Sequence, residues 1–158
     1  MASASAFSEP AARATIAPFA GEAGSLLPIL HALQKRFGYI DKRAVPIIAE
    51  ALNLSRAEVH GVVSFYHDFR VAPFEGRVLK LCRAESCQAA GADELVAHLA
   101  ARHGLVVDRE VGPIKVETVY CLGNCALSPA ALIDGEPIGR LDAARLDDVI
   151  AAAKAGGR

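Results

Sequence analysis

The four cysteines of this chain constrain its fold more than any other feature, because they fall into two short clusters. The first cluster has four residues between its cysteines and the second has three; the cysteines are Cys82, Cys87, Cys121 and Cys125. Thirty-three residues separate the clusters, which is enough for one helix and a returning strand. Two loop tips can therefore meet and place four thiolates around one metal centre, either iron–sulfur or zinc.

Other uses of the thiols compete with an iron–sulfur cluster. A disulfide framework fits poorly, because four cysteines in 158 residues are sparse and no secretory signal precedes them. Zinc sites usually offer cysteine pairs separated by two residues, and a thioredoxin-like redox pair needs the same spacing. The wider spacers suit a larger two-iron centre held from both ends. The spacing thus favours a [2Fe–2S] cluster over structural zinc or inert thiols.

Composition excludes several classes of function. The hydrophobic content is 53% and the formal charge is −1, as in an ordinary globular protein. The 17 lysines and arginines are spread along the chain, so no basic stripe indicates nucleic-acid binding. No apolar run approaches the ~20 residues of a membrane helix.

Residues 1–20 lack the basic start and apolar stretch of a secretory signal. We interpret them as a disordered or loosely docked tail and expect a cytoplasmic protein.

A helical bundle is predicted over residues 21–72. Apolar residues spaced three and four apart follow Ser25, which can cap a first helix, and Gly38 is placed to end it. A second helix is predicted from Asp41. The segment 55–58, Ser-Arg-Ala-Glu, is a capping box that begins a third helix. Three short helices would be marginal alone, so we expect the bundle to pack against another surface, such as a partner protein.

A mixed-sheet domain is predicted over residues 77–155, in the order strand, helix, strand, strand, strand, helix. Strands at 78–81 and 114–120 each end at a cysteine, Cys82 and Cys121. If these two strands run parallel, their carboxyl ends meet at one edge of the sheet, where ligands usually bind. The fold class is therefore α+β, with a helical bundle followed by a mixed sheet that carries the cysteines.

Three motifs give the chain a specific resemblance. They are Cys82-Arg-Ala-Glu-Ser-Cys87, Tyr120-Cys-Leu-Gly-Asn-Cys125 followed by Pro129, and Glu58-Val-His-Gly-Val-Val-Ser-Phe-Tyr66. Together they resemble the thioredoxin-like [2Fe–2S] ferredoxin family, over nearly the whole chain after residue 20. That family includes the 24-kDa subunit of respiratory NADH dehydrogenase, the related subunit of NAD-reducing hydrogenases, and the gamma subunit of NAD-dependent formate dehydrogenase.

The resemblance implies an electron-transfer subunit with one [2Fe–2S] cluster in a thioredoxin-like domain. It implies that Cys82 and Cys87 bind one iron and that Cys121 and Cys125 bind the other. It also implies a partner subunit that holds flavin mononucleotide and binds NAD, close to this cluster. This chain would convert no substrate itself, and no dinucleotide fingerprint occurs in its sequence.

The parent complex is the least constrained inference. Segments 26–31 and 51–61, the latter ending in His60-Gly61, look most like the formate dehydrogenase gamma subunit. That resemblance implies a large partner subunit holding a molybdenum cofactor and iron–sulfur centres. The alternatives are the respiratory NADH dehydrogenase, an NAD-reducing hydrogenase, and, from another class, a structural zinc-binding interaction module.

The histidines show no metal-binding spacing, and we expect structural or exposed roles for all of them: His31, His60, His67, His98 and His103. The pair Asp147-Asp148 is interpreted as a solvated helix face. The aromatic residues Phe65, Tyr66 and Phe69 either dock on a partner or pack within the chain.

Overall fold

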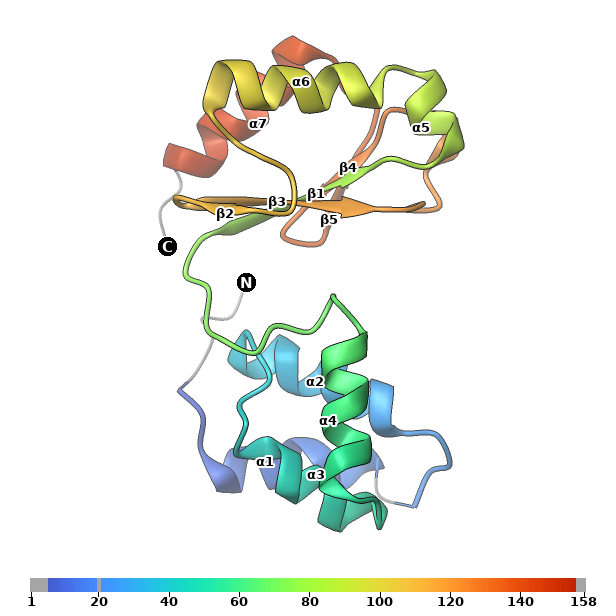
Figure 1. The fold of residues 1–158 in the computed structure, drawn as a ribbon, viewed down its shortest axis with the longest axis vertical. Coiled ribbons are helices and arrows are strands. Elements are labelled where there is room, and N and C mark those ends of the chain that lie inside the picture. The colour runs from blue at the N-terminus through green and yellow to red at the C-terminus, as the bar shows by residue number, and fades with distance from the viewer. Residues whose placement is uncertain (1–5, 20, 156–158) are drawn as a thin grey trace. The chain divides into compact units, whose positions relative to one another are not determined.

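The computed structural model describes residues 6–19 and 21–155, which fold into two compact units (Figure 1). The first unit, residues 1–74, is helical, and the second, residues 75–158, is built on a five-stranded sheet. This architecture confirms the predicted α+β class. Among the described helices, none combines the length and the apolar character that a membrane span requires.

The helical unit packs its helices around one aliphatic core. The fully buried side chains include Ile29 and Leu30 of the second helix and Ile48 of the third. Its elements are α1 (Glu9–Ile16), the 3-10 helix η1 (Ala17–Phe19), α2 (Leu26–Phe37), α3 (Ala44–Leu52) and α4 (Arg56–Phe65).

Helix α1 corrects the prediction of a disordered or loosely docked tail over residues 1–20. Ala12 and Ile16, spaced one helical turn apart, are 0% and 2% exposed and join the core. Arg13 also forms ion pairs with Glu9 and with Glu50 of α3, at 3.0 and 3.1 Å. The prediction was wrong for this segment because docking on the other helices, rather than local propensity, orders it. Residues 1–5 and 20 lie outside the described part.

Two of the three predicted helix caps are confirmed. Gly38 has the left-handed φ of 83° that ends α2. The capping box of α4 is complete: the Glu58 N–H donates to Ser55 Oγ at 3.1 Å, and the Ser55 N–H donates to Glu58 Oε2 at 2.8 Å. The prediction for Ser25 was wrong, because its hydroxyl makes no cap bond and is buried without a hydrogen-bond partner among the described residues.

Helix α3 begins at Ala44 rather than at Asp41, because Asp41 serves as an acceptor before the helix. Its carboxylate accepts the Arg43 backbone N–H at 2.8 Å and the Arg43 guanidinium at 2.7 Å, and Tyr39 Oη donates at 2.9 Å. These bonds, led by those from the Arg43 side chain, outweigh burial and hold the pKa of the Asp41 carboxyl far below its usual range.

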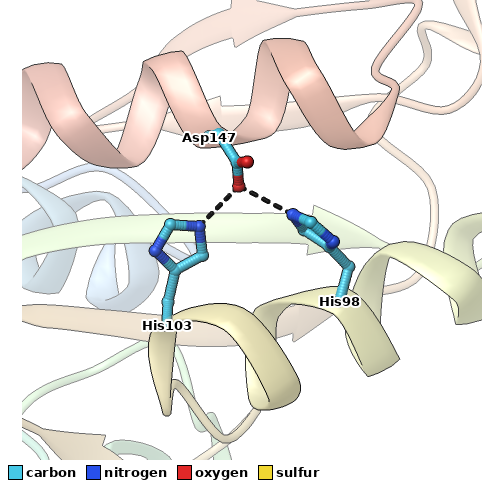
Figure 2. Close-up of side chains that lie close together, drawn as sticks. All are labelled: His98, His103 and Asp147. Carbon is cyan, nitrogen blue, oxygen red and sulfur yellow. Dashed lines mark hydrogen bonds and ion pairs between the residues drawn. The ribbon is translucent and has the colours of Figure 1, made fainter.

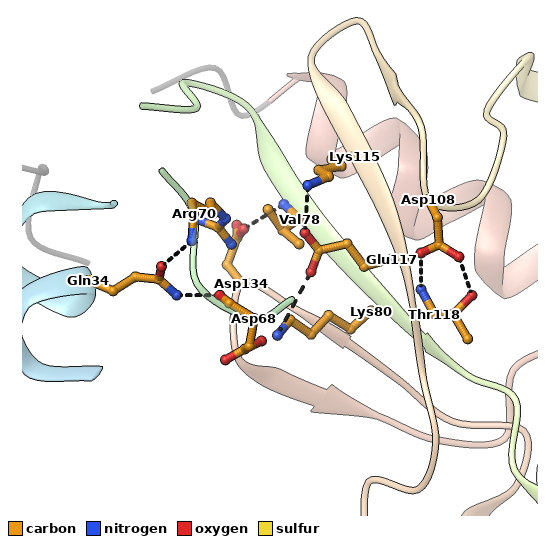
Figure 3. Close-up of polar contacts among 10 residues, drawn as sticks. All are labelled: Gln34, Asp68, Arg70, Val78, Lys80, Asp108, Lys115, Glu117, Thr118 and Asp134. Atoms are coloured by element: carbon orange, nitrogen blue, oxygen red, sulfur yellow. Dashed lines mark hydrogen bonds and ion pairs between the residues drawn. The ribbon is translucent and has the colours of Figure 1, made fainter. Parts of the chain in front are cut away.

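The segment after α4 is fixed to α2 by one side chain. Gln34 donates to the Asp68 carbonyl and accepts from the Arg70 N–H, both at 2.7 Å (Figure 3). Phe69 is thereby held in the core, 7% exposed, whereas Phe65 of α4 is 73% exposed. The aromatic residues thus divide between packing within the chain and exposure.

The sheet of the second unit has the strand order β2-β3-β1-β4-β5. Strands β1 and β3 pair in parallel, as predicted, and the other three pairings are antiparallel. The elements are β1 (Arg77–Cys82), α5 (Glu85–Ala89), α6 (Ala92–His103), β2 (Glu110–Val111), β3 (Ile114–Val119), the 3-10 helix η2 (Cys125–Leu127), β4 (Ala131–Ile133), β5 (Glu136–Ile138) and α7 (Ala143–Ala155). Helix α5 and strand β2 were not predicted.

Helices α6 and α7 lie together on one face of this sheet (Figure 1). Leu79 and Leu81 of β1, two residues apart, point to that face and pack with residues of both helices, among them Leu99 and Ile150. The strands also make polar contacts: Glu117 forms ion pairs with Lys80 and Lys115, and Asp134, in the turn after β4, accepts the Val78 N–H at 3.0 Å (Figure 3). This core fixes β1, which ends at Cys82, and β3, which ends two residues before Cys121.

Candidate metal centre

The paired strands β1 and β3 bring the two cysteine clusters to one edge of the sheet. Cys82 is the last residue of β1 and lies opposite Val119, the last residue of β3, so Cys121 follows two residues later. Cys87 lies in α5 and Cys125 begins η2. The parallel pairing confirms that both strands end at the same edge.

The sulfur atoms form two close pairs. Cys121 Sγ and Cys125 Sγ are 3.9 Å apart, and the thiol of Cys87 lies close enough to Cys82 to help lower the pKa of the Cys82 thiol. A tetrahedral metal ion with metal–sulfur bonds of ~2.3 Å places two of its thiolates about 3.8 Å apart. The spacing of Cys121 and Cys125 therefore fits two ligands of one metal ion.

The chemistry of the donors fits an iron–sulfur centre. Four thiolates from two loops are the ligand set of a [2Fe–2S] cluster.

Backbone amides near Cys82 stabilise a negative charge on its sulfur. Burial, the largest influence, disfavours its thiolate, but the N–H groups of Ala84, Cys121 and Leu122 and the thiol of Cys87 all donate toward it. Together these donors outweigh burial, and the pKa of Cys82 lies below its ordinary value. Amides that stabilise a thiolate also stabilise a cluster ligand.

The other pair has the opposite tendency. The pKa of Cys125 is raised, because its thiol bonds to Cys121 and the charge of a Cys121 thiolate lies beside it, with smaller effects of Cys87 and Cys82. Crowded thiolates repel one another unless a cation lies between them. A cation between these thiols would relieve the repulsion.

The loop between Cys121 and Cys125 turns by means of left-handed residues. Cys121 and Gly123 have φ values of 77° and 73°, and the Gly123 N–H reaches Cys121 Sγ at 3.4 Å. A side chain at residue 123 would strain this turn. Gly123 thus gives both the turn and an amide donor to a sulfur.

Three residues that sequence reasoning did not single out brace this loop. Ser128 Oγ bonds to the Cys125 carbonyl and to Ser86 Oγ, both at 2.8 Å, and lies 3.5 Å from Cys87 Sγ, so it links the two clusters. Gly139 lies against the loop, where a Cβ atom would come within 2.5 Å of Leu127 Cβ. No short-range sequence signal reveals either contact, because each depends on how β5 and α5 approach the loop.

The two pairs differ in exposure. Cys82 and Cys87 are each 2% exposed, whereas Cys121 and Cys125 are exposed. The neighbouring Tyr120 is 74% exposed and Leu127 is 38% exposed. One side of the centre is therefore enclosed by protein, and the other side is open to another molecule.

Comparison with known families agrees with this geometry. The profile described as thioredoxin-like [2Fe–2S] ferredoxin matches residues 12–154. This chain belongs to the thioredoxin-like [2Fe–2S] ferredoxin family. Its cofactor is accordingly one [2Fe–2S] cluster, as the cysteine spacing and the resemblance predicted. The match begins within α1, so both units of the chain belong to the region that the family shares.

Two relatives cover most of the chain. It is 32% identical over 145 residues to NADH-quinone oxidoreductase subunit 2 of Thermus thermophilus, a match that covers 89% of this chain and 80% of the relative. It is 29% identical over 132 residues to NADP-reducing hydrogenase subunit HndA of Solidesulfovibrio fructosivorans, covering 81% and 76%.

A solved structure shows a similar fold. The crystal structure of an NAD+-reducing [NiFe]-hydrogenase in its air-oxidized state matches 83% of this chain with a TM-score of 0.70 and 30% identity. The match covers 23% of that chain, so most of the hydrogenase chain has no counterpart here.

Proposed function

We propose that this chain is an electron-transfer subunit in which Cys82, Cys87, Cys121 and Cys125 ligate its [2Fe–2S] cluster. The observation that carries the proposal is the convergence of two close thiol pairs, from loops after two parallel strands, at one edge of the sheet. Cys82 and Cys87 bind one iron, and Cys121 and Cys125 bind the other. When bound, the cluster supplies the uptake and release of one electron at a time.

The protein's own residues hold the cluster and leave one side accessible. The first pair is buried, and amides donate to the sulfur of Cys82, which excludes water and stabilises negative charge there. The second pair is exposed beside Tyr120 and Leu127. A partner's flavin can approach from this side, and the cluster exchanges electrons with it. The chain contributes no group that converts a substrate.

The complex that best accounts for the sequence is an NAD-dependent formate dehydrogenase in the cytoplasm. In it, one partner subunit binds flavin mononucleotide and NAD, and a large subunit holds the molybdenum cofactor and further iron–sulfur centres. Support comes from the segment 51–61, which begins in α3 and enters α4 and whose His60-Gly61 resembles the gamma subunit of such enzymes. The relatives from an NADH-quinone oxidoreductase and a hydrogenase support the broader role and favour those complexes as the alternative.

Deleting the gene separates these complexes. We expect the loss or impairment of NAD-linked formate oxidation, while membrane-bound NADH oxidation stays at the parental rate. A copy of the gene that encodes the intact chain restores the activity, and a copy with Cys82→Ala does not. Loss of NADH oxidation instead would assign the chain to a respiratory complex, and loss of hydrogen-dependent NAD reduction alone would assign it to a hydrogenase.

Purification gives an independent answer. The tagged chain is expected to bring down a flavoprotein and a large subunit that contains molybdenum in near-equal amounts. A preparation that contains nickel in place of molybdenum would contradict the formate assignment while leaving the electron-transfer role intact.

A further inference from the structure

Three side chains with metal-binding atoms meet between helices α6 and α7 of the sheet unit. His98 and His103 extend from α6 toward Asp147 of α7 (Figure 2). Their Nε2 atoms lie 2.7 and 2.6 Å from the same oxygen, Asp147 Oδ1. One ligand atom from each side chain falls within 4.8 Å of both others, and no other group of this kind occurs among the described residues.

We propose that His98, His103 and Asp147 form a binding site for a divalent transition-metal ion, with zinc as the best-suited ion. Imidazole nitrogens favour zinc and its neighbours, whereas calcium and magnesium prefer a shell made of oxygen alone. Two histidines and one carboxylate are a known three-ligand set for zinc, with water in the fourth position. This site is separate from the cysteines and does not depend on the proposed function.

The distances show how little must move. Ligand atoms of a tetrahedral zinc ion, with bonds of ~2.0–2.2 Å, lie about 3.3–3.5 Å apart. The present nitrogen–oxygen distances are 2.7 and 2.6 Å, so each pair has to open by less than about 1 Å, which side-chain rotation provides. Both Nε2 atoms approach the same carboxylate oxygen, so an ion bound by all three side chains would replace these two hydrogen bonds with metal–ligand bonds.

The three side chains are buried enough to hold a metal ion and exposed enough for it to enter from solvent. His103 is 13% exposed, His98 is 27% exposed and Asp147 is 36% exposed, so the ligands are largely shielded but can be reached from solvent. A metal ion held by both helices links α6 to α7, which together cover the sheet. Zinc binding is therefore expected to raise the thermal stability of the sheet unit.

Titration of the full-length, cluster-loaded chain with zinc ions, after treatment to remove adventitious metal, tests the proposal. The visible absorbance of the cluster is recorded throughout, so that zinc replacing iron at the cysteines is detected separately. We expect one zinc ion to bind per chain with the cluster retained, and the melting temperature to rise.

Matched variants locate the site. Asp147→Asn, His98→Gln and His103→Gln each remove one ligand and are expected to weaken zinc binding by more than the roughly 10–100-fold typical of outer-shell partners. The controls Asp148→Asn, one residue further along α7, and His60→Gln, in the helical unit, are expected to bind like the parent. Failure of the parent to bind zinc, or equal loss of binding in the controls, overturns the proposal.

A measurement on the parent alone guards against variants that do not fold. In protein labelled with 15N at histidine, zinc is expected to shift the ring-nitrogen resonances of His98 and His103 and to leave those of His31, His60 and His67 unchanged. A shift confined to the latter three, or no shift at all, overturns the proposal.

Discussion

The helical unit and the cysteine end of the sheet unit are stabilised in different ways. In the helical unit, one continuous cluster of large aliphatic side chains, including Ile29, Leu33 and Ile48, joins the described helices. Around the cysteines, the buried cluster contains only small side chains, namely Cys82, Cys87, Ala92 and Ala130. Each buried CH₂ group contributes ~0.8 kcal/mol, so small side chains contribute little hydrophobic stabilisation at this end of the sheet.

This difference indicates which part of the chain needs its cofactor. The helical unit can be stabilised by its own packing, and the sheet has its own core under α6 and α7. The cysteine loops instead have two thiol pairs, one bridging serine and a left-handed turn. In the proposed ligation the cluster bonds to both loops, so its binding free energy becomes folding free energy for this end of the sheet unit.

Replacing a cysteine should produce the largest effect. Cys121→Ala is expected to lose the cluster, because one iron then lacks a ligand, and to loosen residues 75–155 while the helical unit stays protected. Limited proteolysis and amide hydrogen exchange on parent and variant measure this difference. Equal exchange rates throughout both proteins would show that the cluster does not stabilise the sheet unit.

A methyl group at residue 139 should have the next largest effect. A Cβ atom there would lie 2.5 Å from Leu127 Cβ and 2.8 Å from the Leu127 carbonyl, so the loop that carries Cys125 must shift. Gly139→Ala is expected to destabilise the sheet unit by roughly 1–3 kcal/mol and to lower its iron content.

The control is Gly61→Ala, in the interior of α4, where a Cβ atom meets nothing within 4 Å. This variant is expected to stabilise the helical unit by about 0.5–1 kcal/mol and to keep its iron. Chemical denaturation and iron analysis compare the two. A Gly139→Ala protein with parental stability and iron content would rule out the steric role of that glycine.

The helical unit should be sensitive to acid through Asp41. Because the pKa of Asp41 is lowered, its ionised carboxylate stabilises the folded state. This stabilisation is complete above the ordinary pKa of 3.8 and declines as the pH falls toward the lower pKa of the folded protein. Asp41→Asn is expected to cost about 1–2 kcal/mol at neutral pH, and this difference should shrink below pH ~4. Denaturant unfolding at several pH values measures it, and a cost that is constant down to low pH would argue against the linkage.

Two serines of the helical unit offer the smallest contrast. Ser55→Ala removes the cap of α4 and is expected to cost about 1 kcal/mol. Ser25→Ala removes a buried hydroxyl that has no hydrogen-bond partner in the described part of the chain, so it is expected to be neutral or slightly stabilising. Thermal unfolding of both variants checks the pair, and a larger loss for Ser25→Ala would show that its hydroxyl has a role that its surroundings do not indicate.

Local sequence signals predicted the parts of the fold that depend on neighbouring residues. The left-handed Gly38, the Ser55–Glu58 box and the strands that lead to Cys82 and Cys121 follow from such signals. Helix α1 and strand β2 did not, because α1 is ordered by docking and β2 has only two residues. Short elements gain their stability from tertiary contacts that no local window contains.

The same limit applies to the site. From the cysteine spacing and the strand order, the sequence predicted that the four cysteines lie together, since parallel strands fix where their ends lie. They could not place Ser128 between the clusters or Gly139 against the loop. The sequence also led to the interpretation of Asp147 as part of a solvated face, whereas its carboxylate accepts bonds from two histidines of α6. That contact depends on how α6 and α7 align across the sheet, which periodicity does not specify.

Metal analysis combined with electron paramagnetic resonance of the purified full-length chain tests the central claim most directly. A [2Fe–2S] cluster on Cys82, Cys87, Cys121 and Cys125 predicts a reddish-brown protein with about two irons and two sulfides per chain. One-electron reduction should then give the signal of a single spin, and each cysteine-to-alanine variant should lose it. A colourless protein that contains one zinc ion, or an intact signal in any of the four variants, would contradict the account.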